Sequence, residues 1–263
     1  LTGGFSKATR QQRVAGSRQL LAERLADWSE ADRNRVLNLH YPAYWLRVDE
    51  EEQVRHAELL RSSDRDKKSF AFEINPMAFE GATGITILTV DHPNLLSVMA
   101  GACSATGANI VDAQFYTTTD GRALDTITVT RLLETDAEEQ KRGERIAGLI
   151  EQALRGDVRL PEMVASRKKR KSRRDAFSIE PAVSVDNGLS DSFTVIEISC
   201  LDRVGLLYDI GRSISELSLN IASAHIATFG ERAVDTFYVT DLLGYKIDSR
   251  NRQNLIRKRI LAA

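Results

Sequence analysis

The stretch Asp-Arg-Val-Gly-Leu-Leu at residues 202–207 decides the fold, because Asp-His-Pro-Asn-Leu-Leu at residues 91–96 repeats its pattern earlier in the chain. A short β-branched run precedes each stretch, and apolar residues at spacings of three and four follow it. This is the pattern of a strand, a loop and a helix with one buried face. A constant shift also superimposes Asn109, Thr117 and Asp125 on Asn220, Thr228 and Asp235, with a one-residue gap at a hairpin. The sequence therefore predicts two copies of one small module.

Each copy is predicted to contain a strand, a helix, two strands joined by a hairpin, and a second helix. The hairpin signals are Asp120-Gly121 in the first copy and Gly230 in the second. We expect strands at residues 85–90, 109–119, 123–130, 194–199, 220–229 and 233–242, and helices at residues 95–106, 137–154, 206–217 and 249–261. Alternating Val183 and Val185 predict a further edge strand at residues 182–186, which we assign to the first module. The alternating segment Phe70, Phe72, Ile74 is a candidate to complete the second module.

The predicted domain organisation has three parts. Residues 1–66 form a helical connector, in which Ser29 with Asp32 and Asp49 with Glu52 predict two helix starts. Residues 67–190 hold the first module, with its core at 84–156 and the edge strand at 182–186, and residues 191–263 hold the second. The basic run at residues 167–174 is interpreted as a solvated linker rather than a phosphate-binding segment, because it contains no aromatic residue for base stacking.

Composition excludes several classes of partner. Lys and Arg number 36 and Asp and Glu number 37 among 263 residues, so no global field attracts nucleic acid, a membrane surface or an acidic substrate. No apolar run approaches the roughly 18–20 residues of a membrane span, and a signal-peptide layout is lacking. Cys103 and Cys200 have neither metal-ligand nor redox-motif spacing, which is typical of reduced cysteines in a cytoplasmic protein. Because the sequence begins at Leu1 rather than Met, we expect a part of a longer protein.

The sequence contains no recognisable catalytic motif. The four histidines never pair at metal-ligand spacing, and no nucleophile elbow, P-loop or dinucleotide fingerprint is present. Ser63-Asp64-Arg65-Asp66 offers carboxylates of the kind that hold Mg²⁺, but no phosphate-binding loop precedes it at short range, and we expect an exposed turn. We therefore predict no catalytic residue, no metal ligand and no cofactor in this chain.

The loop between the first strand and first helix of each copy is the best candidate for a binding site. Free backbone N–H groups at a helix start suit a carboxylate and an aspartate suits an ammonium group, so Asp202 with Gly205 is suited to an amino-acid zwitterion. The alternative is that Asp202 is a helix cap and Gly205 permits a close backbone approach. Asn220 and Ile221, which open the next strand, are expected beside this loop.

These motifs resemble those of an ACT domain. The residues that carry the resemblance in the second copy are Asp202–Leu207, Asn220-Ile221, Gly230-Glu231-Arg232 and Asp235-Thr236-Phe237, and those in the first are Asp91, Leu95-Leu96, Asn109-Ile110, Asp120-Gly121 and Asp125-Thr126. The stretch at residues 40–47, followed by residues 55–60, is similar to the segment before the C-terminal tandem ACT pair of the bifunctional PII uridylyltransferase and uridylyl-removing enzymes. The resemblance implies an α+β fold of two ferredoxin-like βαββαβ modules in tandem after a helical connector.

The resemblance also implies a regulatory role. In that family a nucleotidyltransferase domain adds UMP to PII signal proteins and a phosphohydrolase domain removes it, both with Mg²⁺ or a similar metal, while the ACT pair senses glutamine. Carried over by position, it implies ligand contacts from Asp202, Gly205, Leu206, Asn220 and Ile221, and weaker ones from Asp91, Asn94, Leu95, Asn109 and Ile110. Because Asn94 stands where Gly205 stands, its side chain is expected to crowd the first site.

The implied partners are an amino acid, above all glutamine, the enzyme's own catalytic domains, and PII signal proteins through the parent enzyme. No membrane or nucleic-acid partner is expected. Three alternatives remain open: a ligand-free ACT pair that acts as an interaction module, the regulatory region of another ACT-bearing enzyme, such as a guanosine tetraphosphate synthetase or an amino-acid biosynthetic enzyme, and phosphate binding through residues 167–174.

Overall fold

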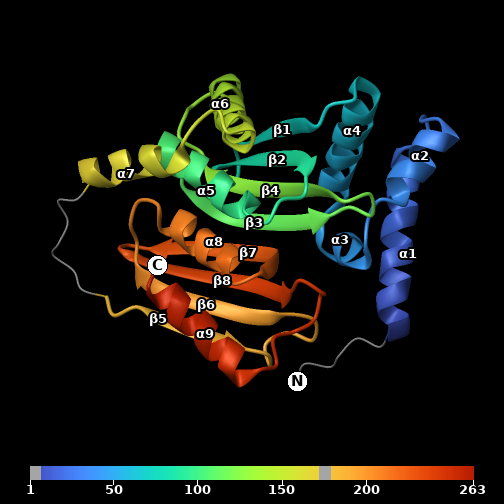
Figure 1. Cartoon of the computed structure of the whole chain (residues 1–263). Coiled ribbons are helices and arrows are strands. Elements are labelled where there is room, and N and C mark those ends of the chain that lie inside the picture. Colours follow the sequence, from blue (N-terminus) through green and yellow to red (C-terminus); the bar gives the residue numbers. More distant parts are fainter. Residues whose placement is uncertain (1–6, 172–178) are drawn as a thin grey trace. The chain divides into compact units, whose positions relative to one another are not determined.

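The structure, a computed structural model, describes residues 7–171 and 179–263. Figure 1 labels its helices and strands. Packing divides the chain into two compact units. The first contains Leu1–Glu73, Thr86–Asp91 and Tyr116–Leu124, and the second contains Ile74–Ile85, His92–Phe115 and Asp125–Ala263.

The helices and strands follow the predicted repeat closely. The helices are α1 Lys7–Arg24, α2 Glu30–Leu37, α3 Pro42–Arg47, α4 Glu50–Asp66, α5 Leu95–Thr106, α6 Asp136–Arg155, α7 Leu160–Lys171, α8 Leu206–Glu216 and α9 Arg250–Leu261. The strands are β1 Phe70–Met77, β2 Ala82–Val90, β3 Ile110–Thr117, β4 Arg122–Thr130, β5 Ala182–Asp186, β6 Thr194–Leu201, β7 Leu219–Phe229 and β8 Arg232–Asp241.

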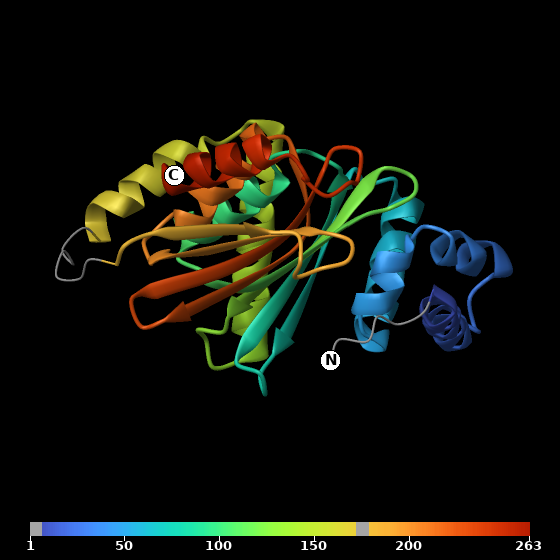
Figure 2. The same ribbon diagram turned by 90° about the horizontal axis from the view of Figure 1, so that it is seen from below.

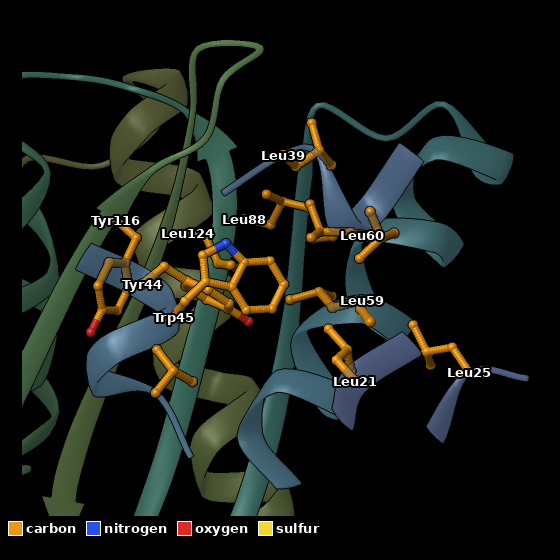
Figure 3. Close-up of a cluster of buried hydrophobic side chains, with 14 residues drawn as sticks. Leu21, Leu25, Leu39, Tyr44, Trp45, Leu59, Leu60, Leu88, Tyr116 and Leu124 are labelled. Carbon is orange, nitrogen blue, oxygen red and sulfur yellow. The ribbon is translucent and has the colours of Figure 1, made fainter. Parts of the chain in front are cut away.

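The first unit contains the helical connector with its own apolar core. Both predicted helix starts are confirmed: Ser29 Oγ accepts a hydrogen bond from the N–H of Asp32 at 3.2 Å, and Asp49 Oδ1 accepts one from Glu52 at 2.9 Å. Figure 3 shows how side chains from helices and strand ends meet in this core. Its fully buried members include Leu21, Leu25, Leu60, Tyr44, Leu88 and Leu124. Burial of large apolar side chains is the main force that holds these short helices together.

Residues 63–66 do not form the expected turn. They end α4, so that prediction is wrong, and the reason is an ion-pair network that a local pattern does not reveal. Asp64 accepts hydrogen bonds from Arg35 Nε at 2.7 Å and from Arg122 Nη1 at 2.9 Å, and all three residues belong to the first unit. The carboxylate of Asp64 is therefore bound by two guanidinium groups.

The sheet has the strand order β1-β2-β4-β3-β7-β8-β6-β5, in which the second half reverses the pattern of the first. The two halves meet where β3 pairs antiparallel with β7, with Ala113 opposite Ala224. The predicted α+β class with tandem ferredoxin-like modules is confirmed. The two modules form one continuous sheet within a single chain, so their pairing does not need a second copy.

The assignment of the edge strands was wrong. Residues 182–186 form β5, which pairs with β6, from Ala182 opposite Ser199 to Asp186 opposite Val195, and therefore belongs to the second module. The Phe70, Phe72, Ile74 segment lies in β1, beside β2 of the first module. The edge strand of each module thus comes before its first core strand instead of after its last helix. Alternation shows that a strand exists, but the free sheet edge that accepts it is a tertiary property.

Helices α5 and α8 lie side by side over one face of the sheet, and Figure 2 shows them there together with α9. Glycines permit this approach: a Cβ atom at Gly211 would lie 3.2 Å from the backbone of Ser97, and one at Gly101 would lie 2.9 Å from the ring of Tyr208. The contact brings the helix starts of each module close to residues of the other.

Part of the predicted linker is helical. Helix α7 packs on α5, and Val164 is fully buried. Residues 172–174 of the basic run lie outside the described residues. The first residues of the run, 167–171, therefore end helix α7 instead of forming an extended linker.

Candidate functional site

A cavity of about 150 Å³ lies in the second unit, between the Asp202–Gly205 loop and the end of α5. Its volume is below the roughly 300–1,000 Å³ of pockets for drug-sized ligands, so it suits a small metabolite. The residues that line it include Ser104, Asn109, Ile110, Arg167, Asp202, Gly205, Leu206, Thr228 and Asp235. Both modules therefore contribute to one small cavity.

The second module places the loop by backbone geometry. Gly205 precedes α8 with φ +79°, a left-handed conformation that glycine adopts at little cost. Asn94, its counterpart, has an ordinary φ of −96°, so the two loops differ in backbone path as well as in side chain. The N–H of Asp202 donates to the carbonyl of Glu231 at 2.8 Å, which fixes the loop against the β7–β8 hairpin. The helix start of α8 consequently faces the cavity.

The first module supplies the opposite wall. Asn109 and Ile110 follow the end of α5, and the carbonyl of Asn109 accepts a hydrogen bond from Thr130 N–H at 2.9 Å. Asn109 also lines the cavity and carries a side-chain amide. The structure thus brings together Asp202, Gly205 and Leu206 of one copy with Asn109 and Ile110 of the other.

Asn220 and Ile221 do not lie beside the Asp202 loop, and that expectation was wrong. Asn220 is opposite Thr240 at the start of β7, whereas the loop follows Leu201, which is opposite Arg232 at the hairpin end. The physical reason is that α8 carries the chain back along the module before β7 begins. Residues of the loop and of the start of β7 are therefore at opposite ends of the sheet.

The remaining predicted residues of the first copy are dispersed. Asp91, in the first unit, accepts a hydrogen bond from Thr117 Oγ1 at 3.1 Å. Asn94 lines a second cavity of about 690 Å³ that also includes Arg159 and Arg212. Leu95 is buried in the helical face of α5. These three do not meet Asn109 and Ile110 in the first cavity.

The cavity includes residues that were not predicted as site residues, among them Asp235 on β8 and Arg167 on α7. Asp235 repeats Asp125 in register and belongs to the Asp235-Thr236-Phe237 motif that carries the ACT resemblance, but no ligand contact was predicted for it. Arg167 opens the basic run at residues 167–174, which was interpreted as a linker, and its Nη1 donates to the carbonyl of Ala105 at 3.2 Å. Its place follows from the packing of α7 on α5.

Asp235 has an unusual electrostatic environment. Its side chain is 2% exposed, and Oδ1 has no hydrogen-bond partner among the residues that the structure describes. Burial, with a smaller contribution from the Asp202 carboxylate, raises the pKa of Asp235 to about 7, although the N–H of Ala227 and the ring of His225 act in the opposite direction. Arg203, by contrast, is engaged by Asp209 Oδ2 at 2.5 Å and by the carbonyl of Ala263 at 2.6 Å.

Within residues 7–171 and 179–263, no group of three His, Cys, Asp or Glu side chains is arranged to hold a metal ion. None of the helices in the described part of the chain combines the length and the apolar character that crossing a bilayer requires. Cys103 and Cys200 are free, and burial raises the pKa of Cys103 to about 12, which suppresses thiolate reactivity.

Comparison with known proteins agrees with this architecture. Residues 182–262 match the family described as the ACR9-like, ACT-like domain, which begins at the first residue of β5. The chain is 51% identical over 261 residues to a bifunctional uridylyltransferase/uridylyl-removing enzyme of Bradyrhizobium sp. (strain ORS 278), and 50% identical to that of strain BTAi1 / ATCC BAA-1182. These matches cover 99% of this chain, which spans 28% of the length of those relatives. Over nearly its whole length, the chain is thus a relative of the ACT region of the bifunctional uridylyltransferase/uridylyl-removing enzymes.

Proposed function

We propose that the cavity binds glutamine and that the chain is the regulatory region of an enzyme that uridylylates and deuridylylates PII signal proteins. The observation that carries the proposal is the joint cavity, in which the Asp202–Gly205 helix start of one module faces Asn109 of the other. An amino acid needs a donor set for its carboxylate, an acceptor for its ammonium group and a polar contact for a side-chain amide. The N–H groups before α8, the aspartates and the Asn109 amide are of these three kinds.

A ligand in this cavity would act on the relation between the modules. It would contact α8 of one module and the end of α5 in the other, and these helices already pack on each other. Regulation requires that the ligand bind two states of the whole enzyme with different affinity. A joint cavity is suited to this role, because a small change in the α5–α8 contact would alter both walls.

Calorimetric titration of the folded chain with glutamine tests the binding proposal. Saturable heat at millimolar or lower glutamine is expected, and Asp202→Ala should weaken binding by about tenfold or more because it removes a charged acceptor. Asp91→Ala, at the corresponding position of the first copy, is the matched control and should change the affinity little. Absence of heat in a chain shown to be folded by circular dichroism would contradict the proposal.

The regulatory half needs the whole enzyme. Transfer of UMP to PII and its removal would be measured across a range of glutamine concentrations, with the Asp202→Ala variant beside the wild-type enzyme. The expected result is that the variant keeps both activities but needs more glutamine to shift the balance between them. An unchanged glutamine response would remove the assigned cavity from the regulatory mechanism.

A further inference from the structure

Asp235 occupies a position where a charged side chain needs a partner. It lies within β8, between β6 and β7, opposite Ile198 on one side and Ile226 on the other. Burial of a carboxylate between two apolar residues is costly unless its oxygens are hydrogen-bonded. The N–H of Ala227 bonds to the carboxylate, while Oδ1 has no partner in the described part of the chain. Since Asp235 also lines the cavity, a ligand bound there is a candidate partner for this oxygen.

The charges around Asp235 determine which kind of ligand group fits. Asp202 adds a second negative charge, and Cys200 on β6 lies near both carboxylates. The neighbouring groups on the other side of the charge balance are the Arg203 guanidinium, which Asp209 already binds, and the ring of His225, whose Nδ1 lies 3.3 Å from Asp112 Oδ1. A ligand carboxylate placed between two aspartates would be repelled, whereas a protonated amine would be attracted to both.

We propose that Asp235, together with Asp202, forms the subsite that binds the protonated amino group of the ligand. This inference rests on the proposed function, because it assumes that the cavity takes an amino acid, and it names the end of the cavity at which the ammonium group lies. The carboxylate of the ligand then lies toward the N–H groups at the start of α8 and the Arg167 side chain. Asp235 is thereby a specificity-determining residue that selects α-amino acids over analogues without the amine.

A second consequence concerns protons. The raised pKa of Asp235 means that part of the population carries a proton on this carboxyl group near neutral pH. An ammonium ligand favours the ionised carboxylate, so its binding releases that proton to the solvent. Asp202, His225, Cys200 and Arg203 face the same region and are present in both the wild type and an Asp235→Asn variant. The difference in proton release between the two proteins therefore reports on residue 235.

The test compares glutamine with its deaminated analogue, 4-carbamoylbutanoate, by calorimetry on the whole chain near pH 7. The wild type should bind glutamine about 10- to 100-fold more tightly than the analogue. Asp235→Asn, which is nearly isosteric, should lose most of this preference, while Asp125→Asn, at the same repeat position of the first module, should keep it. Titration in buffers of different ionisation enthalpy should show proton release by the wild type and less by Asp235→Asn. Circular dichroism confirms that both variants are folded.

The outcomes of this experiment separate the two proposals. If glutamine binds and Asp235→Asn keeps the full preference for the amine, the subsite is overturned while the proposed function stands. A wild type that binds the analogue as tightly as glutamine overturns the subsite in the same way, without any variant. If another of the twenty amino acids binds instead of glutamine and Asp235→Asn weakens it, the subsite is supported and glutamine is not the ligand. If none binds, both proposals are overturned.

Discussion

Gly107, which ends α5, lies against the guanidinium group of Arg167 on α7, so closely that a Cβ atom at residue 107 would be 2.1 Å from Arg167 Nη2. The glycine also has φ +81°, as the end of the helix requires. The nearest atom belongs to the end of a long side chain that can move aside. Because residue 107 has no side chain, the Arg167 guanidinium can lie beside it at the cavity. We expect this effect on the position of Arg167 to matter more than any effect on stability.

Gly107→Ala should separate these two roles. Its left-handed φ predicts a loss of stability of about 1 kcal/mol, and its methyl group should displace Arg167 and weaken ligand binding. Gly156→Ala is the matched control, because Gly156 ends α6 with φ +82° and no described atom lies within 4 Å of a Cβ there. Thermal unfolding should give similar losses for both, while calorimetry should show weaker binding only for Gly107→Ala. Equal affinities would exclude a role for Arg167 in the cavity, as would wild-type affinity in Arg167→Ala.

The contact between α5 and α8 makes a prediction about helix-interior glycines. Gly211→Ala should destabilise the fold, because its methyl group would lie 3.2 Å from the backbone of Ser97, which cannot move aside easily. Gly148→Ala, inside α6 with no described atom within 4 Å of its Cβ, should instead stabilise by up to about 1 kcal/mol through helix propensity. Urea unfolding measures both. If the Gly211→Ala protein were as stable as the Gly148→Ala protein, the contact between α5 and α8 would be looser than described.

The adjacent residues Glu138 and Glu139 on α6 should differ sharply in their contribution to the free energy of unfolding. Glu139 is fully buried and accepts hydrogen bonds from the N–H groups of Leu132 and Leu133, from Thr83 Oγ1 and from Arg142. Glu139→Gln replaces one carboxylate oxygen with an NH₂ group, which is a donor and would face the donors that now bind the carboxylate. The substitution should cost about 3 kcal/mol or more in unfolding free energy. Glu138 only completes the exposed capping box with Thr135, so Glu138→Gln should cost less than about 1 kcal/mol. Urea unfolding of the two variants measures the difference.

The Glu139 carboxylate should also make the stability of the fold depend on pH in the acid range. Burial raises the pKa of Glu139, but its hydrogen bonds and Arg142 outweigh this effect and hold the pKa below the ordinary value. The stability that Glu139 contributes is therefore present above the unfolded pKa and is lost as the pH falls through the folded pKa. Glu139→Gln should reduce the acid sensitivity of unfolding, and a variant with the wild-type pH profile would contradict this assignment.

Two buried histidines in the first unit predict a further loss of stability in acid. His40 stacks on Tyr44 with ring centroids 3.7 Å apart, and His56 Nδ1 lies 3.2 Å from the Tyr44 hydroxyl. Burial lowers the pKa of each histidine to about 3. Below about pH 6.5 the unfolded chain takes up protons that the folded unit does not, so each contributes a loss of roughly 1.4 kcal/mol per pH unit until the folded pKa is reached.

Proton NMR provides the direct measurement for these histidines. The ring signals of His40 and His56 should not titrate above pH 5 in the folded chain, whereas the same signals should titrate near pH 6.5 in the unfolded chain, which is the control. A midpoint near pH 6.5 for His40 or His56 would mean that its ring is solvated and that the packing around Tyr44 is looser than described.

Local patterns in the sequence determined the elements of this protein and their repetition. Asp-Gly at 120–121 predicted a hairpin that the structure contains, and the capping residues Ser29 and Asp49 mark helix starts that are present. Strand alternation and helical spacing depend on neighbours a few residues apart, so they can be read without the fold. The loop at Asp202 was recognisable for the same reason, since a helix start is a local feature.

The tertiary structure alone decided which of these parts meet. The sequence places Asn220 after the same helix that begins beside Asp202, but the length of α8 separates the two residues and the β3–β7 pairing brings Asn109 to the cavity instead. The same pairing of sheet edges decides that β5 completes the second module. Burial makes Asp235 distinctive and packing brings Arg167 to the cavity, and both effects arise from residues distant in sequence. Contacts of this kind depend on the free energy of the whole assembled sheet, which no local pattern encodes.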